Sequence, residues 1–349
     1  MTYSEGILEA FEYLLENHKE FFVIGQGLWS PWYVGSTMKD LDKKYGKERV
    51  IDCPVSELAT TGATVGAAIC GYRPLIVHPR VDFMLLAVDQ IVTQAAKWRH
   101  MFGGNSSCPA TFRAIINRGG EQGAQHSQSL QSWFAHIPGL KVISPSSPYT
   151  AKGLLISAIE DPNPVIFIEH RWIHDVIEDV PDEIYRIPLN KSIVLKQGEE
   201  LTVVTSSFQT NQVRALYSLF DSAKVSIEHI DLISYAPLDL DTIYESVNKT
   251  KRLVIIDDGY PVVSVASEIA FRVVEKLFSK ILKPPLCILR DNIPEPTSFN
   301  LTKSQYISNE RIISEILSYL GRNQDYTKFH PKDLNVLHDI PHPDFKGPF

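Results

Sequence analysis

Short apolar runs alternate with longer amphipathic segments through most of the chain, and this alternation constrains the fold more than any other feature. Strands buried on both faces of a parallel sheet read as continuous apolar runs, and the segments between them are long enough for crossover helices. The pattern therefore predicts an α/β fold with a mostly parallel sheet. In the first half the runs are FFVIGQG, RVIDCPVSE, RPLIVHPR, ATFRAIINRGG, LKVISPSS and NPVIFIEHR.

The chain has 349 residues, more than one hydrophobic core usually holds, so we expect two domains. Between the strands, VDFMLLAVDQIVTQAAKWRHMFGG predicts one long helix that ends at paired glycines. The alternation weakens after Asp175 and resumes near Leu201. We expect a first domain over 1–175, a linker over 176–200, a smaller α/β domain over 201–321 and an extended tail over 322–349.

Composition excludes several classes of function. Hydrophobic residues make up 44% of the chain and charged residues 21%, which is typical of a soluble globular protein with a substantial core. The net charge of -7 gives no electrostatic reason to bind nucleic acid, and no apolar run is long enough to span a bilayer. The start of the chain predicts an acidic amphipathic helix rather than a signal peptide. We expect a cytoplasmic protein whose scattered cysteines are reduced core thiols: Cys53, Cys70, Cys108 and Cys287.

Three residues follow predicted strands at the positions where α/β sheets bind ligands, beyond the carboxyl ends of the strands. Glu57 follows RVIDCPVS, Phe83 follows RPLIVHPR, and His126 lies in the glycine-rich loop NRGGEQGAQHSQ. Each has an ordinary structural explanation. Glu57 could satisfy backbone donors at a helix start, Phe83 could be core, and His126, like His136, could be a hydrogen-bonded structural histidine. Their convergence is what indicates a site.

Several segments resemble the beta subunits of the thiamin-diphosphate-dependent first component of 2-oxo-acid dehydrogenases, such as the pyruvate and branched-chain complexes. The resemblance runs from about Phe21 to Gly321. It implies a two-domain transketolase-like α/β fold, with a pyrimidine-binding domain followed by a smaller C-terminal domain. The segments that carry it are RVIDCPVSE, VDFMLLAVDQIVTQAAK, GAQHSQSLQSWFAHIPGLKVISPSSPYTAKGLL, DPNPVIFIEH, IEHIDLISYAPLDLDTI and RLVIIDDG.

The resemblance also implies roles for the three candidates. Glu57 matches the carboxylate that hydrogen-bonds a pyrimidine nitrogen of the cofactor and favours its imino tautomer. Phe83 matches the aromatic residue that packs on the pyrimidine ring, where a flat face supplies contact area and orientation together. His126 matches the histidine that lines the substrate channel, and a glycine-rich loop lets such a side chain approach the substrate.

A structural cation site is a further implication. Ala158, Asp161 and Asn163 match positions that bind a monovalent cation, K+, in some relatives. Backbone carbonyl groups at a helix end offer the oxygen ligands that a hard cation prefers. The alternative is an ordinary helix C-terminus, and the sequence leaves both open.

Half of the cofactor site is absent from the sequence. Enzymes of this family hold Mg2+ and the diphosphate with a GDG motif, whereas this chain contains DDGYP and no GDG. The resemblance therefore implies an alpha subunit that carries the motif, an α2β2 assembly and a lipoyl acyltransferase as acceptor.

Four places depart from the family pattern. Gln26 replaces an acidic residue after the first strand, and GLWSPWYVGSTMKDL carries Trp29, Trp32 and Tyr33 as a reshaped substrate wall or as interface packing. Relatives are more apolar where this chain has His78 and Arg80, and Arg80 could bind an acidic substrate group or pair with a carboxylate. In the second domain, GYPVVSVASEIA lacks the family's glycine-rich turn. These departures cast doubt on pyruvate as the substrate.

We therefore expect oxidative decarboxylation of a 2-oxo acid, with acyl transfer to a lipoyl group. The alternative enzyme is a split transketolase or a non-oxidative carboligase that uses the same cofactor. A third possibility is a non-catalytic scaffold subunit, which would have no physical need for the pairing of Glu57 with His126.

Overall fold

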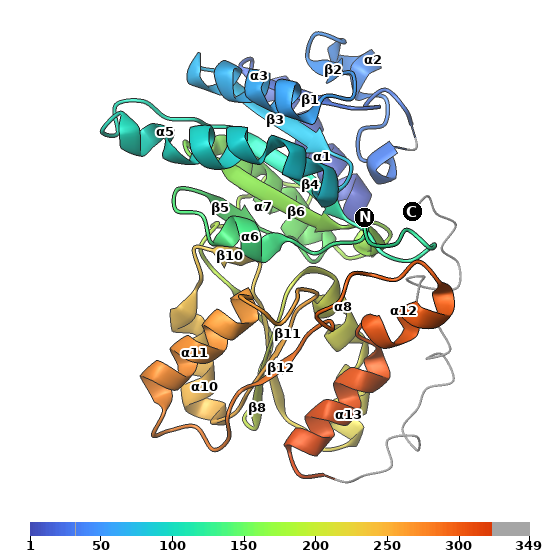
Figure 1. The fold of residues 1–349 in the computed structure, drawn as a ribbon, viewed down its shortest axis with the longest axis vertical. Helices are drawn as coiled ribbons and strands as arrows, with labels where there is room; N and C mark the ends of the chain where they lie inside the picture. Colours follow the sequence, from blue (N-terminus) through green and yellow to red (C-terminus); the bar gives the residue numbers. More distant parts are fainter. Residues whose placement is uncertain (32, 323–349) are drawn as a thin grey trace.

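The computed structural model describes residues 1–31 and 33–322, and all structural statements concern this part of the chain (Figure 1). Two β-sheets with flanking helices lie one above the other along the long axis of the molecule. Trp32, the side chain of Tyr33 and nearly all of the tail predicted over 322–349 lie outside the described residues. The two sheets confirm the predicted α/β class.

The first sheet has seven described strands in the order β10-β5-β6-β4-β3-β1-β2. All pairs are parallel except that of β10 with β5. The central strands are buried along almost their whole length because helices cover both faces, which explains their continuous apolar runs. The strands are β1 Phe21–Gly25, β2 Val50–Asp52, β3 Arg73–His78, β4 Thr111–Ile116, β5 Lys141–Ile143, β6 Val165–His170 and β10 Ser234–Ala236.

One prediction for the helices of the first domain is wrong. The predicted long helix after β3 is a succession of α, 3-10 and π turns, because π turns insert an extra residue that an apolar period does not reveal. The helical segments are α1 Tyr3–Asn17, η1 Tyr33–Ser36, α2 Leu41–Tyr45, α3 Glu57–Ile69, α4 Val81–Met84, η2 Leu85–Ala87, η3 Asp89–Ala95, α5 Ala96–Met101, α6 Gln131–Ala135, α7 Pro148–Glu160 and η4 Arg171–Ile173.

The second sheet has five described strands in the order β12-β11-β8-β9-β7, parallel except for the edge strand β7. The strands are β7 Ile193–Lys196, β8 Leu201–Thr205, β9 Ile227–Asp231, β11 Leu253–Ile256 and β12 Leu286–Ile288. The helices are α8 Ser207–Ala215, α9 Tyr217–Ser222, α10 Leu240–Thr250, α11 Val265–Leu277, α12 Phe299–Gln305 and α13 Asn309–Tyr319.

Two short strands complicate the expected division into domains. β7 lies inside the segment 176–200, predicted as a linker, and is half exposed, so it lacks the apolar run of a buried strand. β10 comes from the segment expected to form the second domain, yet it pairs with β5 of the first sheet. A strand of three residues has too little pattern to be recognised in a sequence.

The two domains share a hydrophobic core. One cluster of buried side chains includes Leu130 and Phe134 beside α6, Tyr235 of β10 and Val265 of α11. The loop between β4 and α6 therefore ends on a surface built by both domains. No helix in the described part of the chain combines the length and apolarity needed to cross a membrane.

A buried carboxylate also joins the domains. Asp231, at the end of β9, accepts hydrogen bonds from Ser146 Oγ of the first domain and from Thr210 Oγ1 at 3.1 Å. Burial raises the pKa of Asp231 to about 7 despite these bonds. Between its ordinary pKa and about 7 the folded chain therefore binds more protons than the unfolded chain, and its free energy of unfolding falls as pH rises through that window.

Asp231→Asn should remove this pH dependence. We expect the variant to gain stability relative to the wild type as pH rises from about 5 to 7, by about 1.4 kcal/mol for each pH unit in this window, with little further change above it. Chemical denaturation of both proteins across this range measures the difference. Asp221→Asn, at an exposed aspartate, is a control that should leave the dependence of the free energy of unfolding on pH unchanged. Parallel stability curves for the Asp231→Asn variant and the wild type would contradict the prediction.

Candidate active site

Four neighbouring parallel strands, β2, β1, β3 and β4, end at the same edge of the first sheet. Glu57 follows β2, Gln26 follows β1, Phe83 follows β3, and the loop with His126 follows β4. Because the strands run parallel, all four side chains belong to the ligand-binding edge of the sheet.

Glu57 is the first residue of α3, and only 6% of its surface is exposed. Gln26 Nε2 donates a hydrogen bond to Glu57 Oε1 at 3.2 Å. No backbone donor of the described residues bonds this carboxylate, so it does not cap its own helix. A buried carboxylate with a single side-chain donor keeps acceptor capacity for a ligand.

The structure brings Phe83 and His126 together. Their ring centroids lie 5.2 Å apart with the planes at 85°, an edge-to-face contact. Both side chains are half-buried, so each keeps surface available to a bound molecule.

The loop over 117–130 carries His126 and has no helix or strand of its own. It contacts the second domain at Gly123, whose φ of +66° lies in the left-handed region. A Cβ at this position would lie 2.5 Å from Oγ1 of Thr297. The glycine is required here both by the backbone conformation and by the close approach to the second domain.

Asp82 anchors the same loop from the first domain. Its Oδ1 accepts hydrogen bonds from the backbone N–H of Gln128 at 3.2 Å and from Gln128 Nε2 at 2.8 Å. Burial raises the pKa of Asp82, and these two bonds act in the opposite direction. No pattern in the sequence marks Asp82 as an anchor, although it directly precedes Phe83.

His78 and Arg80, which depart from the family pattern, are both held by contacts within the chain. Burial lowers the pKa of His78 to about 4, so its ring is neutral at physiological pH. The ring is buried, and its Nε2 lies 3.3 Å from Thr61 Oγ1. Arg80 donates hydrogen bonds to the carbonyl of Pro79 at 2.9 Å and to Gln122 Oε1 at 3.4 Å, in the His126 loop.

Trp29 lies beside β2, where its Nε1 donates to the carbonyl of Val50 at 2.8 Å. Lys47 Nζ lies 3.9 Å from the centroid of its ring, and 41% of the residue is exposed. These contacts favour surface packing over a substrate wall.

The proposed cation ligands sit at the end of α7. The carbonyl of Ala158 accepts from Thr111, and the carbonyl of Asp161 accepts from Arg73 at 3.3 Å. The carboxylate of Asp161 pairs with Lys141 and accepts from the backbone of Asn163 at 2.9 Å. These contacts use part of the acceptor capacity of the three groups, while each backbone carbonyl keeps a second lone pair, so the cation site stays a prediction.

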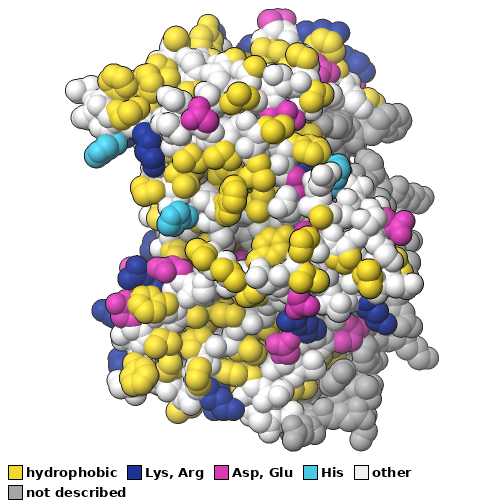
Figure 2. Space-filling view, in the orientation of Figure 1, with side chains coloured by type: hydrophobic (Ala, Val, Ile, Leu, Met, Phe, Trp, Pro, Cys, Tyr) yellow, Lys and Arg dark blue, Asp and Glu magenta, His cyan; other side chains and the backbone are white. Residues whose placement is uncertain are grey.

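A second surface lies between α6 and the start of α11, and it includes Ser129 and Leu130 at the end of the loop that carries His126. A cavity of about 530 Å³ is lined largely by apolar side chains, including Trp133, Tyr260, Val262 and Val263. Trp133 is 58% exposed, and Figure 2 shows hydrophobic side chains gathered on this face. Such an exposed apolar surface is typical of contact with another protein.

Comparison with known proteins identifies the class. Residues 1–173 match the pyrimidine-binding domain of transketolase, and residues 190–312 match the transketolase C-terminal domain. The solved structure of a split-gene transketolase, an inactive β4 tetramer, shares the fold with a TM-score of 0.74. It is 16% identical in sequence, and the match covers 93% of this chain and 99% of that chain.

Two relatives are more informative about the family. The pyruvate dehydrogenase E1 component subunit beta of Porphyra purpurea is 37% identical, over 83% of this chain and 87% of its own length. The acetoin:2,6-dichlorophenolindophenol oxidoreductase subunit beta of Cupriavidus necator is 41% identical, over 74% of this chain and 77% of its own length. The chain belongs to the family of beta subunits of thiamin-diphosphate-dependent 2-oxo-acid dehydrogenases, as the sequence resemblance predicted.

The contact between the loop and the second domain generates a prediction about Gly123. Gly123→Ala should lose about 1–2 kcal/mol to its left-handed backbone and a further amount to the contact with Thr297. Gly103→Ala is the matched control, because Gly103 has a φ of +59° and no atom within 4 Å of the added Cβ. Thermal unfolding should show the larger loss for Gly123→Ala.

A double variant, Gly123→Ala with Thr297→Ala, should recover the part of the loss that comes from the contact. Equal losses in the two single glycine variants, with no recovery in the double variant, would show that the loop does not lie against the second domain.

Proposed function

We propose that this chain is the beta subunit of an enzyme that oxidatively decarboxylates a pyruvate-like 2-oxo acid and transfers the acyl group to a lipoyl group. The observation that carries the proposal is the placement of Glu57, Phe83 and His126 at one sheet edge, with the last two in contact. The family relationship supports it.

The residues present fit the pyrimidine half of thiamin diphosphate. Glu57 is buried and bonded only by Gln26 among the described side chains, which leaves an acceptor for a ring nitrogen. Phe83 is half-buried and offers an apolar ring for stacking.

In the proposed mechanism the cofactor, when bound, supplies the electron sink for decarboxylation. Glu57 holds a proton in a hydrogen bond to the pyrimidine and thereby favours the tautomer that can accept a further proton. Gln26 orients the Glu57 carboxylate, and Phe83 fixes the ring plane. His126 would hydrogen-bond the 2-oxo oxygen of the substrate and could donate its imidazole proton to that oxygen as negative charge develops there.

A partner chain is part of the proposal. We infer an alpha subunit that supplies the GDG motif, Mg2+ and the diphosphate contacts, in an α2β2 assembly. Val55 and Leu58, beside Glu57, and Leu86, beside Phe83, are exposed apolar side chains that another subunit could cover. A lipoyl acyltransferase as acceptor and a cytoplasmic location stay predictions.

A second candidate is the oxidative cleavage of acetoin. It is favoured by relatives named as acetoin oxidoreductase beta subunits, which are 41% and 38% identical to this chain. The reaction would use the same residues, because acetoin also presents a carbon–oxygen group to His126. The split transketolase stays a third candidate. The structural likeness at 16% identity shows the fold alone and does not favour this activity over the other two.

Turnover by the complex with its alpha subunit tests the proposal. We expect reduction of an artificial electron acceptor with 2-oxo acids or acetoin as donor, and the donor screen separates the first two candidates. Activity only with phosphorylated sugars would support the transketolase instead.

Glu57→Gln should lower turnover about 10²–10⁴-fold, the usual contribution of general acid–base catalysis, because an amide cannot share a proton with the pyrimidine. Assembly and folding should be retained. Glu310→Gln, at a first-turn glutamate of α13, is the control that leaves turnover unchanged. Near-normal turnover of a cofactor-saturated Glu57→Gln complex would refute the assigned role.

A further inference from the structure

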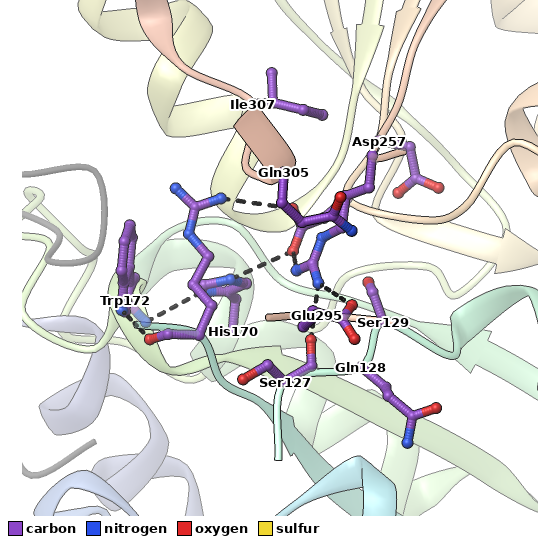
Figure 3. Close-up of polar contacts among 12 residues, drawn as sticks. Ser127, Gln128, Ser129, His170, Trp172, Asp257, Glu295, Gln305 and Ile307 are labelled. Atoms are coloured by element: carbon purple, nitrogen blue, oxygen red, sulfur yellow. Dashed lines mark hydrogen bonds and ion pairs between the residues drawn. The ribbon is translucent and has the colours of Figure 1, made fainter. Parts of the chain in front are cut away.

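The loop that carries His126 is held by a buried arginine of the second domain. Arg290 lies two residues beyond β12, and its Nη1 donates a hydrogen bond to the backbone carbonyl of Ser127 at 2.8 Å. Figure 3 shows Ser127 and Glu295, which both accept hydrogen bonds from this guanidinium, next to each other. Arg290 and Ser127 are both almost fully buried. Because Ser127 directly follows His126, this bond fixes the backbone from which the imidazole projects.

Arg290 is itself fixed by two carboxylates. Its Nη1 also donates to Glu295 Oε1 at 2.8 Å, and its Nη2 donates to Asp258. The hydroxyl of Tyr260 donates to the same oxygen of Glu295. A guanidinium with planar, directed donors is held in one orientation by such contacts, so the bond to Ser127 has a defined direction.

The carboxylate of Asp258 connects this group to the first domain. It lies 3.6 Å from Arg118 Nη1 and 3.6 Å from His170 Nε2, both at the carboxyl edge of the first sheet. The backbone N–H of Trp172 donates to His170 Nδ1 at 3.1 Å, which leaves the ring proton on Nε2, facing Asp258. The arginine is thus oriented relative to the sheet that carries Glu57 and Phe83.

Further contacts from both domains hold the chain on the C-terminal side of this bond. Asp82 holds Gln128 from the first domain, while Gln131 Nε2 donates to Asp257 of the second domain at 2.9 Å. The backbone N–H of His126 donates to the carbonyl of Gly123 at 3.3 Å. The segment around His126 therefore has contacts from both domains. Among the contacts on the C-terminal side of the histidine, the bond from Arg290 to Ser127 is the closest to it.

We propose that Arg290 is a positioning residue, which holds the Ser127 carbonyl so that His126 faces Phe83 and the substrate. This rests on the proposed function of His126. Arg290 touches neither substrate nor cofactor and acts only through the loop. The second domain then determines the geometry of a catalytic group of the first domain.

Arg290→Lys tests the proposal in the complete complex with the alpha subunit and thiamin diphosphate. Lysine keeps the positive charge between Asp258 and Glu295, but a compact ammonium on a shorter side chain cannot make all three contacts. The control is Arg322→Lys. Arg322 also bonds a carboxylate, Glu200, and backbone carbonyl groups, and none of its contacts involves the loop.

Two readouts are expected to change together. Hydrogen–deuterium exchange of peptides from 117–130 should accelerate in Arg290→Lys and not in Arg322→Lys. The kcat should fall about 10- to 100-fold, as expected for a misplaced catalytic group, while KM stays nearly unchanged. In a His126→Ala background, Arg290→Lys should cause no further loss of kcat.

The outcomes distinguish failure of the positioning role of Arg290 from failure of the proposed function of His126. An equal loss of kcat with and without His126, or unchanged exchange of the loop in Arg290→Lys, would overturn the positioning role while the proposed function stands. Wild-type turnover by His126→Ala would instead refute the proposed function of the histidine, and with it the reason for positioning it.

Discussion

Hydrogen bonds between β2, β1, β3 and β4 hold these strands parallel, and every residue of the candidate site depends on that alignment. Residues far apart in the sequence, from Gln26 to His126, meet only because each follows a strand that ends at the same edge. The edge places Gln26 against Glu57, and Phe83 against His126. The proposed pyrimidine half-site therefore depends on sheet topology more than on any single residue.

The second constraint is the charge buried where the carboxyl ends of the two sheets meet. Burial alone would raise the pKa of Asp258, but the charge of Arg290, together with the neighbouring His170 and Arg118, outweighs it and holds the pKa well below its usual range. Burial lowers the pKa of His170 to about 4, so the ring is neutral and its Nε2 lies 3.6 Å from Asp258. Removing one member of such a buried pair typically costs about 3–5 kcal/mol, because its partner is left as an uncompensated buried charge.

The sequence predicted the features that repeat along the chain. The buried strands of both sheets have continuous apolar runs, and the positions of Glu57, Phe83 and His126 follow from those runs. It missed β7 and β10, which are too short or too exposed for such a pattern, and the π turns of η3. It also missed the contact between Arg290 and Ser127, because 163 residues separate them and no local pattern marks a bond between a side chain and a distant carbonyl.

The central claim is that this chain holds one half of a thiamin diphosphate site and that a partner holds the other. Calorimetric titration with thiamin diphosphate and Mg2+, of the chain alone and of its complex with the alpha subunit, tests it most directly. Most of the charge of the cofactor lies in its diphosphate, and this chain has a net charge of -7 and no GDG motif. We predict weak binding by the isolated chain and tight, stoichiometric binding by the complex. Tight stoichiometric binding by the chain alone would contradict the claim.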